Sequence, residues 1–314
     1  MTRCCPASHL RTALRIGLLI AMVWLVVTDV VGAARAAQQP GAAAYAGSIE
    51  TWRAAREAEL RADDGWLTLV GLFWLHEGPN AIGGGDANAV PLPTSSSPPH
   101  LAVLALKAGV VRITPEPGTA LRINGKPASA QTLAPQPGNY DTLTIGSLTF
   151  FVIKRGDRFG VRVKDRESEA RRTFAGLRWF PIREASRIRA RFVAHATPTS
   201  IMIANVLGNI DAWPSPGYAA FTLDGHEYRL HAVLDGADAK ELFFVFRDLT
   251  TGQETYPGGR FLYAAMPVNG EVVLDFNKAH SPPCAFTPFA TCPVPPKENH
   301  LAVRIEAGEL DPHR

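Results

Sequence analysis

The amino-terminal part of the chain contains one short apolar run. Residues 16–27 are almost entirely apolar, follow three arginines, and precede the small-residue stretch 34–36. A run of about a dozen residues is shorter than the roughly 20 that a helix needs to cross a hydrocarbon core. The order of basic, apolar and small residues predicts a secretory signal peptide over 1–36, cleaved after Ala36. The alternative is an uncleaved membrane anchor, with a tilted helix extending to Ala34.

One helix is expected after this segment. Residues 37–47 consist mostly of Ala, Gly, Gln and Pro and predict a disordered tether. Ser48 is a suitable cap for an amphipathic helix that ends before Asp63. The apolar run 66–75 lies between turn residues and predicts a buried strand.

From Leu101 onward, short strands recur at intervals of about ten residues, with turn residues between them. The expected strands are 110–113, 142–145, 148–154, 159–164, 187–193, 201–206, 218–223, 226–233 and 242–248. This spacing is typical of an antiparallel sandwich or partly open barrel rather than of βαβ units. We therefore predict a mainly β domain over 48–309 with one N-terminal helix, and with a division near residue 181 as the alternative.

Cleavage of the signal peptide would change both the charge and the cysteine content. The first 36 residues hold four of the 32 basic and one of the 29 acidic residues, which leaves 28 of each sign. Such an even balance argues against a nucleic-acid partner held by phosphate neutralisation. Only Cys284 and Cys292 would remain, and an oxidising compartment favours a disulfide between them. Half of a metal site is the alternative, but the second close pair of Cys or His that zinc usually requires is missing.

The segment around these two cysteines forms a long proline-rich loop. Six prolines between 282 and 296 exclude regular secondary structure and restrict the backbone. The loop either covers a sheet edge or forms one wall of a pocket. In the second case, the polar contacts to a ligand would come from Arg260, Asp275, Asn277 and Asn299.

A basic strand is the second candidate for binding. Eight basic residues and four acidic ones lie between residues 154 and 172. Arg162 and Lys164 alternate with valines, so the cations share one face of the strand. This face could receive a carboxylate, a phosphate or an anionic polymer. An ordinary solvated strand face is the simpler interpretation.

Motifs for catalysis and for cofactors are missing from the sequence. It has no Gly-x-Ser-x-Gly elbow, no His-Glu-x-x-His helix and no phosphate-binding Gly-Lys-Ser/Thr loop. No cofactor and no metal are therefore expected. A hydrolase remains an alternative, with Asp275 or a histidine as the base near the cysteine loop.

Several patterns in the same order resemble one protein family. They are Gly65-Trp66-Leu67, Gly71-Leu72-Phe73-Trp74-Leu75, Gly160-Val161-Arg162-Val163-Lys164-Asp165, Trp179-Phe180-Pro181, Thr255-Tyr256-Pro257-Gly258-Gly259-Arg260, Val273-Leu274-Asp275-Phe276-Asn277 and the proline-rich segment 282–299. Together they resemble DUF1684, a bacterial and archaeal family of unknown function, over roughly residues 50–309. The resemblance implies a β-rich exported or cytoplasmic protein, and it implies no activity or cofactor. Family members tend to carry an aromatic residue and Asn where this chain has His280 and Ser281, so no role for those two side chains follows.

These observations favour an exported, periplasmic or extracellular protein that binds a small or polymeric anionic ligand. The ligand would lie between the basic strand and the cysteine loop. The alternatives are the hydrolase and a structural or partner-binding envelope protein that presents residues 66–75. No stable membrane span is expected after cleavage.

Overall fold

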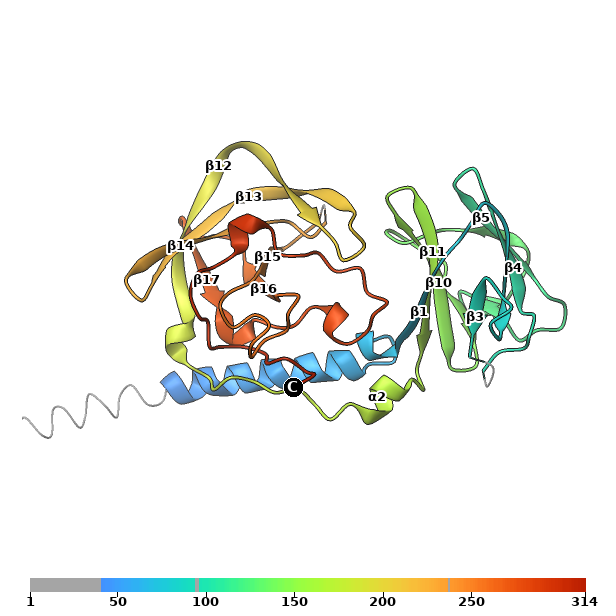
Figure 1. The fold of residues 1–314 in the computed structure, drawn as a ribbon, viewed down its shortest axis with the longest axis horizontal. Helices are drawn as coiled ribbons and strands as arrows, with labels where there is room; N and C mark the ends of the chain where they lie inside the picture. The colour runs from blue at the N-terminus through green and yellow to red at the C-terminus, as the bar shows by residue number, and fades with distance from the viewer. Residues whose placement is uncertain (1–40, 94–95, 237) are drawn as a thin grey trace, which may run out of the picture. The chain divides into compact units, whose positions relative to one another are not determined.

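The computed structural model describes residues 41–93, 96–236 and 238–314 (Figure 1). The predicted signal peptide and residues 37–40 lie outside the described residues. The chain divides into two compact units, residues 1–51 and 52–314. In the first unit, residues 41–51 are helical, including 41–47 where the sequence suggested a disordered tether. The second unit begins with helical residues 52–61.

The front half of the second unit is a β-sandwich built from two sheets (Figure 1). The six-stranded sheet contains, in spatial order, β1 (Leu69–Trp74), β11 (Arg158–Asp165), β10 (Leu148–Arg155), β9 (Leu143–Ile145), β6 (Arg122–Ile123) and β7 (Lys126–Pro127). The five-stranded sheet contains β3 (Val90–Leu92), β2 (Gly78–Gly84), β4 (Ala102–Lys107), β5 (Val110–Pro115) and β8 (Gln131–Leu133). Buried aliphatic and aromatic side chains of both sheets form one core, which includes Ile82, Leu104, Ile113, Phe150, Val161 and Val163.

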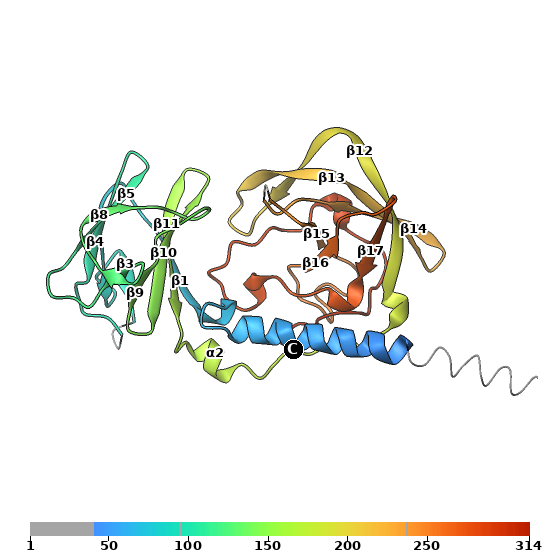
Figure 2. The ribbon, with the colours of Figure 1, turned by 180° about the vertical axis from the view of Figure 1, so that it is seen from behind.

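The back half contains two further sheets and a second core (Figure 2). The four-stranded sheet has the order β14 (His226–Ala232), β13 (Ile210–Leu223), β12 (Arg187–Ala204) and β17 (Glu271–Asp275). The two-stranded sheet pairs β15 (Glu241–Phe246) with β16 (Arg260–Ala265). The short helices are η1 (Trp66–Thr68), α2 (Glu169–Thr173), η2 (Glu184–Ser186), η3 (Phe276–Lys278), η4 (Pro283–Ala285) and η5 (Lys297–Asn299). Because sheets dominate and most pairs are antiparallel, the predicted fold class is confirmed.

Strand β15 is buried on both faces. Phe244 and Phe246 belong to the core of the back half, whereas Phe243 and Val245 belong to a smaller cluster that also contains Cys292. Side chains alternate between the two faces of a strand, so one strand serves two apolar clusters. This explains why its sequence is an apolar run rather than an alternating one.

The structure differs from the sequence-based expectation in several local features, and two of them lie at predicted strands. The apolar run 66–75 begins as the 3-10 helix η1 and becomes strand β1 only at Leu69. Strands β12 and β13 are much longer than predicted and form one hairpin, because register shifts between Ala194 and Thr199 let pairing continue past the expected ends. In the described parts of the chain, no helix is both long enough and apolar enough to cross a membrane.

Candidate functional site

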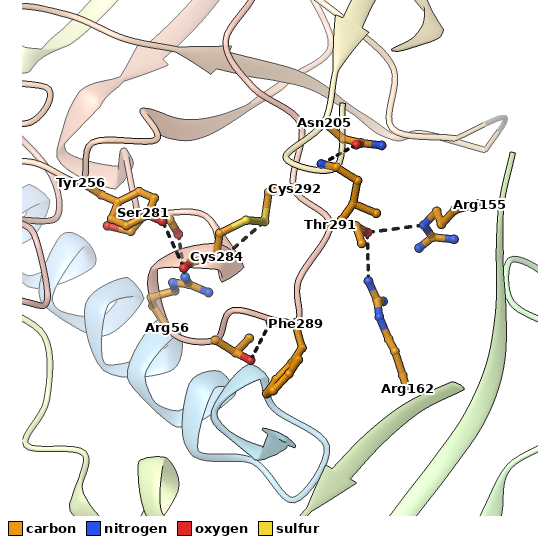
Figure 3. The surroundings of a disulfide bond; sticks show 12 residues. Arg56, Arg155, Arg162, Asn205, Tyr256, Ser281, Cys284, Phe289, Thr291 and Cys292 are labelled. Carbon is orange, nitrogen blue, oxygen red and sulfur yellow. Dashed lines mark hydrogen bonds between the residues drawn. A yellow bond between two sulfur atoms is a disulfide. The ribbon is translucent and has the colours of Figure 1, made fainter. Parts of the chain in front are cut away.

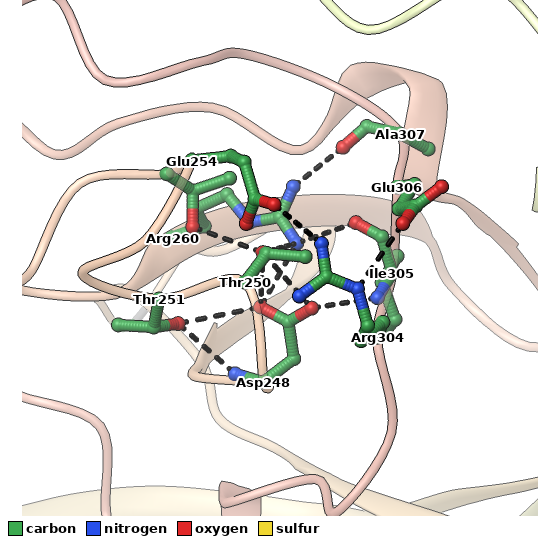
Figure 4. A network of polar contacts seen from close by, with 10 residues as sticks. Asp248, Thr250, Thr251, Glu254, Arg260, Arg304, Ile305, Glu306 and Ala307 are labelled. Atoms are coloured by element: carbon green, nitrogen blue, oxygen red, sulfur yellow. Dashed lines mark hydrogen bonds and ion pairs between the residues drawn. The ribbon is translucent and has the colours of Figure 1, made fainter. Parts of the chain in front are cut away.

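Arg260 lies inside a buried ionic network rather than in an open pocket (Figure 4). Its side chain is 0% exposed, and Nη2 is 3.1 Å from Oδ1 of Asp248. Nη2 also donates to the carbonyl of Ile305 at 3.0 Å, and Nη1 donates to the carbonyl of Ala307. Desolvation lowers the pKa of Arg260, and Asp248 opposes this shift. The guanidinium therefore ties β16 to the C-terminal segment.

Asp275 and Asn277 hold the end of β17. Asn277 accepts from the backbone N–H of Arg183 at 3.0 Å and donates to its carbonyl at 2.8 Å. Asp275 caps η3 by accepting from the backbone N–H of Asn277 at 3.2 Å. These bonds attach the segment before β12 to the segment after β17.

Asn299 makes a comparable set of contacts at a different place. Its side chain accepts from the backbone N–H of His231 at 2.7 Å and donates to the carbonyls of His231 and Val245 at 3.0 Å. In the hydrogen bonds described above, Arg260, Asp275 with Asn277, and Asn299 have different partners. The structure does not bring these predicted residues together at one surface, and their predicted contact with a ligand stays a prediction.

The proline-rich loop is closed by the predicted disulfide between Cys284 and Cys292, whose Cα atoms are 6.2 Å apart (Figure 3). The hydroxyl of Tyr256 donates to the carbonyl of Cys284 at 3.1 Å. Thr287 donates to the carbonyl of Leu69 at 2.8 Å, so the loop also contacts the front sandwich. Disulfide and hydrogen bonds together fix a segment that the prolines exclude from regular structure.

We expect replacement of both cysteines by alanine to lower the free energy of unfolding by about 2–3 kcal/mol, from the loop entropy that a short closed loop removes from the unfolded chain. Denaturant unfolding of the oxidised protein and of the Cys284→Ala, Cys292→Ala variant measures this difference. A dithiol reductant should destabilise the wild type by a similar amount and leave the variant unchanged. Equal stability of the oxidised wild type and the variant would contradict the expectation.

Arg162 and Arg155 both reach the same hydroxyl of the disulfide loop (Figure 3). Nη2 of Arg162 donates to Oγ1 of Thr291 at 3.0 Å, and Nε of Arg155 donates to the same atom at 3.5 Å. The tight turn at Gly156 and Asp157 places Arg155 opposite Arg158 at the end of the β10–β11 hairpin. We call Arg155, Arg162 and Thr291 the two-arginine site.

The electrostatics of this site are unusual because two cations share it. Arg162 is only 5% exposed, and its Nε has no hydrogen-bond partner among the described residues. Burial, and to a lesser extent the charge of Arg155, lower the pKa of Arg162 to about 10. Burial also lowers the pKa of Arg155, which Asp211 partly offsets. The site holds a positive charge that the surrounding protein compensates only weakly.

Lys164 lies on the same strand but has a different partner. Its Nζ donates to the carbonyl of Asp64. Burial lowers the pKa of Lys164, Asp64 opposes the shift, and Arg162 adds to it. The sequence placed Arg162 and Lys164 on one face of the strand, and it did not reveal that the cysteine loop covers part of that face. The sequence analysis did not identify Arg155 and Thr291 as candidate site residues. The end of the β10–β11 hairpin and the disulfide loop are far apart in the sequence, and only the tertiary structure brings them together.

One hydroxyl and imidazole pair was a possible sign of hydrolytic chemistry. Ser215 Oγ lies 3.3 Å from Nε2 of His195, but the hydroxyl donates to the carbonyl of Ala232 at 2.7 Å. With its proton used there, the hydroxyl acts as an acceptor toward the imidazole. This geometry does not activate Ser215 as a nucleophile. Within the described ranges, no three His, Cys, Asp or Glu side chains are grouped as metal ligands would be.

Comparison with known proteins identifies a family. The family described as protein of unknown function DUF1684 matches residues 172–310. Among solved structures, the chain is similar to an uncharacterized protein of Haloarcula marismortui determined by solution NMR. The identity is 36% over 45% of this chain and 78% of that chain, with a TM-score of 0.38.

Two FHA domains are also similar to part of the chain. One is the FhaA FHA domain complexed with an intracellular domain, with 17% identity over 30% of this chain and 97% of that chain and a TM-score of 0.22. The other comes from an analysis of phosphothreonine-dependent FHA domain interactions, with 20% identity over 31% and 96% of the two chains and a TM-score of 0.22. No curated protein matches the chain. The residues matched by the family include the proline-rich loop and the buried Arg260 network. The chain belongs to the DUF1684 family.

Proposed function

We propose that this protein is an exported binding module for an anionic ligand, which it takes up at the two-arginine site. The observation that supports this most directly is the convergence of Arg155 and Arg162 on the hydroxyl of Thr291. Export follows from the predicted signal peptide, which makes the site available to ligands of the cell envelope.

The charge of the site favours an anion. Two guanidinium groups repel each other, and a buried cation without a counter-charge is costly. Among the ion pairs of the described residues, none involves Arg155 or Arg162. A carboxylate, sulfate or phosphate group would supply the missing negative charge.

The hydrogen bonds favour the same ligand. Thr291 accepts from both arginines, so its own O–H is left to donate to a third group. Arg162 keeps an unpartnered Nε–H as a further donor. Several donors around one point match the oxygen atoms of an oxyanion, and bonds to charged groups are the stronger kind.

We expect Arg162→Met to weaken anion binding by at least about tenfold, which corresponds to the loss of about 1.4 kcal/mol. The free energy of unfolding in anion-free buffer should not fall, because methionine fills apolar space and removes an uncompensated charge. Titration calorimetry with sulfate, phosphate and citrate measures the first effect, and denaturant unfolding measures the second.

Two further variants make this experiment decisive. Thr291→Val removes the shared hydroxyl at nearly constant volume and should also weaken binding. Arg112→Ala removes an exposed arginine of β5 and is the matched control, because it changes the net charge equally without touching the site. The proposal fails if the wild type binds none of these anions, or if Arg112→Ala and Arg162→Met reduce affinity equally.

A further inference from the structure

The β12–β13 hairpin, which lies at the periphery of the back half (Figure 1), carries exposed aliphatic side chains near its turn. Four of them are between 39% and 61% exposed: Met202, Val206, Leu207 and Ile210. Met202 stands opposite Ala212, and Ile210 stands opposite Ala204, so one face of the two strands is apolar over this length. The turn that joins the strands contains the other two residues. We call the four residues the apolar hairpin end.

This hairpin has almost no charge. Residues 192–223 contain a single Asp, Glu, Lys or Arg, namely Asp211, in a chain that is 19% charged. Asp211 stands opposite the buried Ile203, so it lies on the other side of the strands from Met202 and Ile210. A strand face that meets only water normally carries polar or charged residues. An exposed face that is apolar and uncharged therefore indicates a docking surface.

The edges of the hairpin are not suited to pairing with a further strand. Pro198 lies in β12, and Pro214 and Pro216 lie in β13. Proline has no N–H to donate, so these residues interrupt the edges. The end of β12 already contacts the disulfide loop, because the N–H of Val206 donates to the carbonyl of Cys292 at 3.0 Å. Docking at the apolar hairpin end therefore has to use side chains rather than backbone hydrogen bonds.

The end of the β10–β11 hairpin lies nearby and is basic. It carries three cations and one acid: Lys154, Arg155, Arg158 and Asp157. Thr291 of the disulfide loop accepts from Arg155 at 3.5 Å, and the next residue, Cys292, accepts from the backbone of Val206 (Figure 3). Two consecutive loop residues thus contact the two hairpin ends. An apolar surface and a positively charged one are neighbours in this part of the molecule.

A lipid surface with negative charge matches this pair of features. Proteins bind to such surfaces by placing apolar side chains at the boundary of headgroups and acyl chains, while cations attract the anionic lipids. A second copy of this chain fits less well, because a stable interface buries roughly 800 Å² on each partner, far more than four partly exposed side chains provide. The apolar hairpin end also contains none of the aromatic and arginine residues that are enriched in protein–protein interfaces.

We propose that this protein binds to an anionic lipid surface, into which the apolar hairpin end inserts while Lys154 and Arg158 contact the lipid phosphates. Both side chains are exposed. The inference goes beyond the proposed function and does not depend on it, because neither Arg162 nor the hydroxyl of Thr291 takes part. Binding of this kind is reversible and needs both contributions, since a small apolar contact alone holds a protein only weakly.

Co-sedimentation of the purified protein with vesicles tests this inference. The protein should bind vesicles of phosphatidylcholine and phosphatidylglycerol in equal amounts more tightly than vesicles of phosphatidylcholine alone. Ile210→Asp should weaken binding to the mixed vesicles at least about tenfold, because it places a charge where the side chain enters the lipid. Val268→Asp is the matched control, because Val268 is 69% exposed and lies outside both hairpin ends. All variants carry the same N-terminal residues, which therefore contribute equally to each comparison.

Two further changes separate the electrostatic from the apolar contribution. Lys154→Gln combined with Arg158→Gln should remove the preference for phosphatidylglycerol, whereas Arg112→Gln, which changes an exposed arginine of β5, should keep it. The fluorescence of an indole introduced by Leu207→Trp should be quenched by lipids brominated in their acyl chains. An indole introduced by Val268→Trp should not be quenched.

Three results would overturn the inference. They are a wild type that does not sediment with the mixed vesicles, equal losses for Ile210→Asp and Val268→Asp, and a dimer in solution that Ile210→Asp dissociates while vesicles are not bound. In the last case a second copy occupies the apolar hairpin end. Arg162→Met should bind vesicles like the wild type. Sulfate binding without vesicle binding would leave the proposed function intact, and vesicle binding without sulfate binding would remove the proposed function alone.

Discussion

Replacing Glu309 by Gln should remove a pH dependence of stability worth about 3 kcal/mol between pH 4.5 and about 7. Glu309 is 0% exposed, and among the described residues neither carboxylate oxygen has a hydrogen-bond partner. Desolvation raises its pKa from 4.5 to about 7, although Arg56 and Ser281 oppose the shift. The nearest cation, Nε of Arg56, is 3.8 Å away.

The sign of the effect follows from proton binding. Below pH 4.5, both the folded and the unfolded chain hold the Glu309 proton, and the group contributes no difference. As the pH rises toward 7, the unfolded chain loses this proton while the folded chain keeps it, so stability falls. Above about pH 7 the full penalty of the buried carboxylate is present.

Charged groups around Glu309 do not mask this effect. Arg56 comes from the helix and Arg260 from β16, and the charges of both lower the pKa of Glu309. The pKa of the neighbouring His280 is lowered to about 3 by burial and by Arg56, so this imidazole stays neutral. Glu309 is then the group of this cluster that titrates near neutrality.

Denaturant unfolding of the wild type and of Glu309→Gln across this pH range measures the prediction. The variant should gain stability relative to the wild type as the pH rises. Glu306→Gln changes a carboxylate three positions away whose side chain is 42% exposed, and it is the control, expected to show the same pH dependence as the wild type. If the free energy of unfolding changes with pH in the same way for Glu309→Gln and for the wild type, the buried carboxylate is not the source of the pH dependence.

Replacing Arg260 by Met should lower the free energy of unfolding by roughly 3–5 kcal/mol. The change removes one partner of a completely buried ion pair and leaves the Asp248 carboxylate without its cation. The carbonyls of Ile305 and Ala307 lose a donor at the same time. Leaving a buried charge without its counter-ion is more costly than the loss of the pair itself.

The free energy of unfolding of two further variants, measured with denaturant, tests this reasoning. Adding Asp248→Asn to Arg260→Met should recover part of the stability, because it removes the uncompensated charge. Arg189→Met removes one partner of an exposed pair with Glu271 at 3.0 Å and should cost less than about 1 kcal/mol. A similar cost for Arg189→Met and Arg260→Met would contradict the role given to burial.

The sequence predicted what depends on local patterns. Alternation of apolar and polar residues located most of the strands, and Gly156 with Asp157 marked the hairpin that displays Arg155 and Arg158. The compartment and the spacing of Cys284 and Cys292 were sufficient to predict their pairing. These features require information from only a few neighbouring residues.

The interior positions of polar residues were not predictable in the same way. Arg260 and Asn299 are residue types that are common in binding sites. Their neighbours in the sequence do not indicate that both side chains donate hydrogen bonds to backbone carbonyls far away in the sequence. The alternation in β11 correctly predicted that Arg162 and Lys164 lie on the opposite side of the strand from the valines. It could not predict that Arg162 is buried, because Thr291, which contacts it, comes from a loop about 130 residues away. Such contacts are set by the tertiary structure.

The burial of β15 on both faces affects how the protein can open. The cluster beneath the disulfide loop, with Phe243 and Val245, and the back core, with Phe244 and Phe246, are supported by the same four consecutive residues. A fluctuation that detached the loop by displacing this strand would hydrate both clusters simultaneously. We therefore expect the disulfide loop and the back core to open together, so that the back half responds as a single cooperative unit.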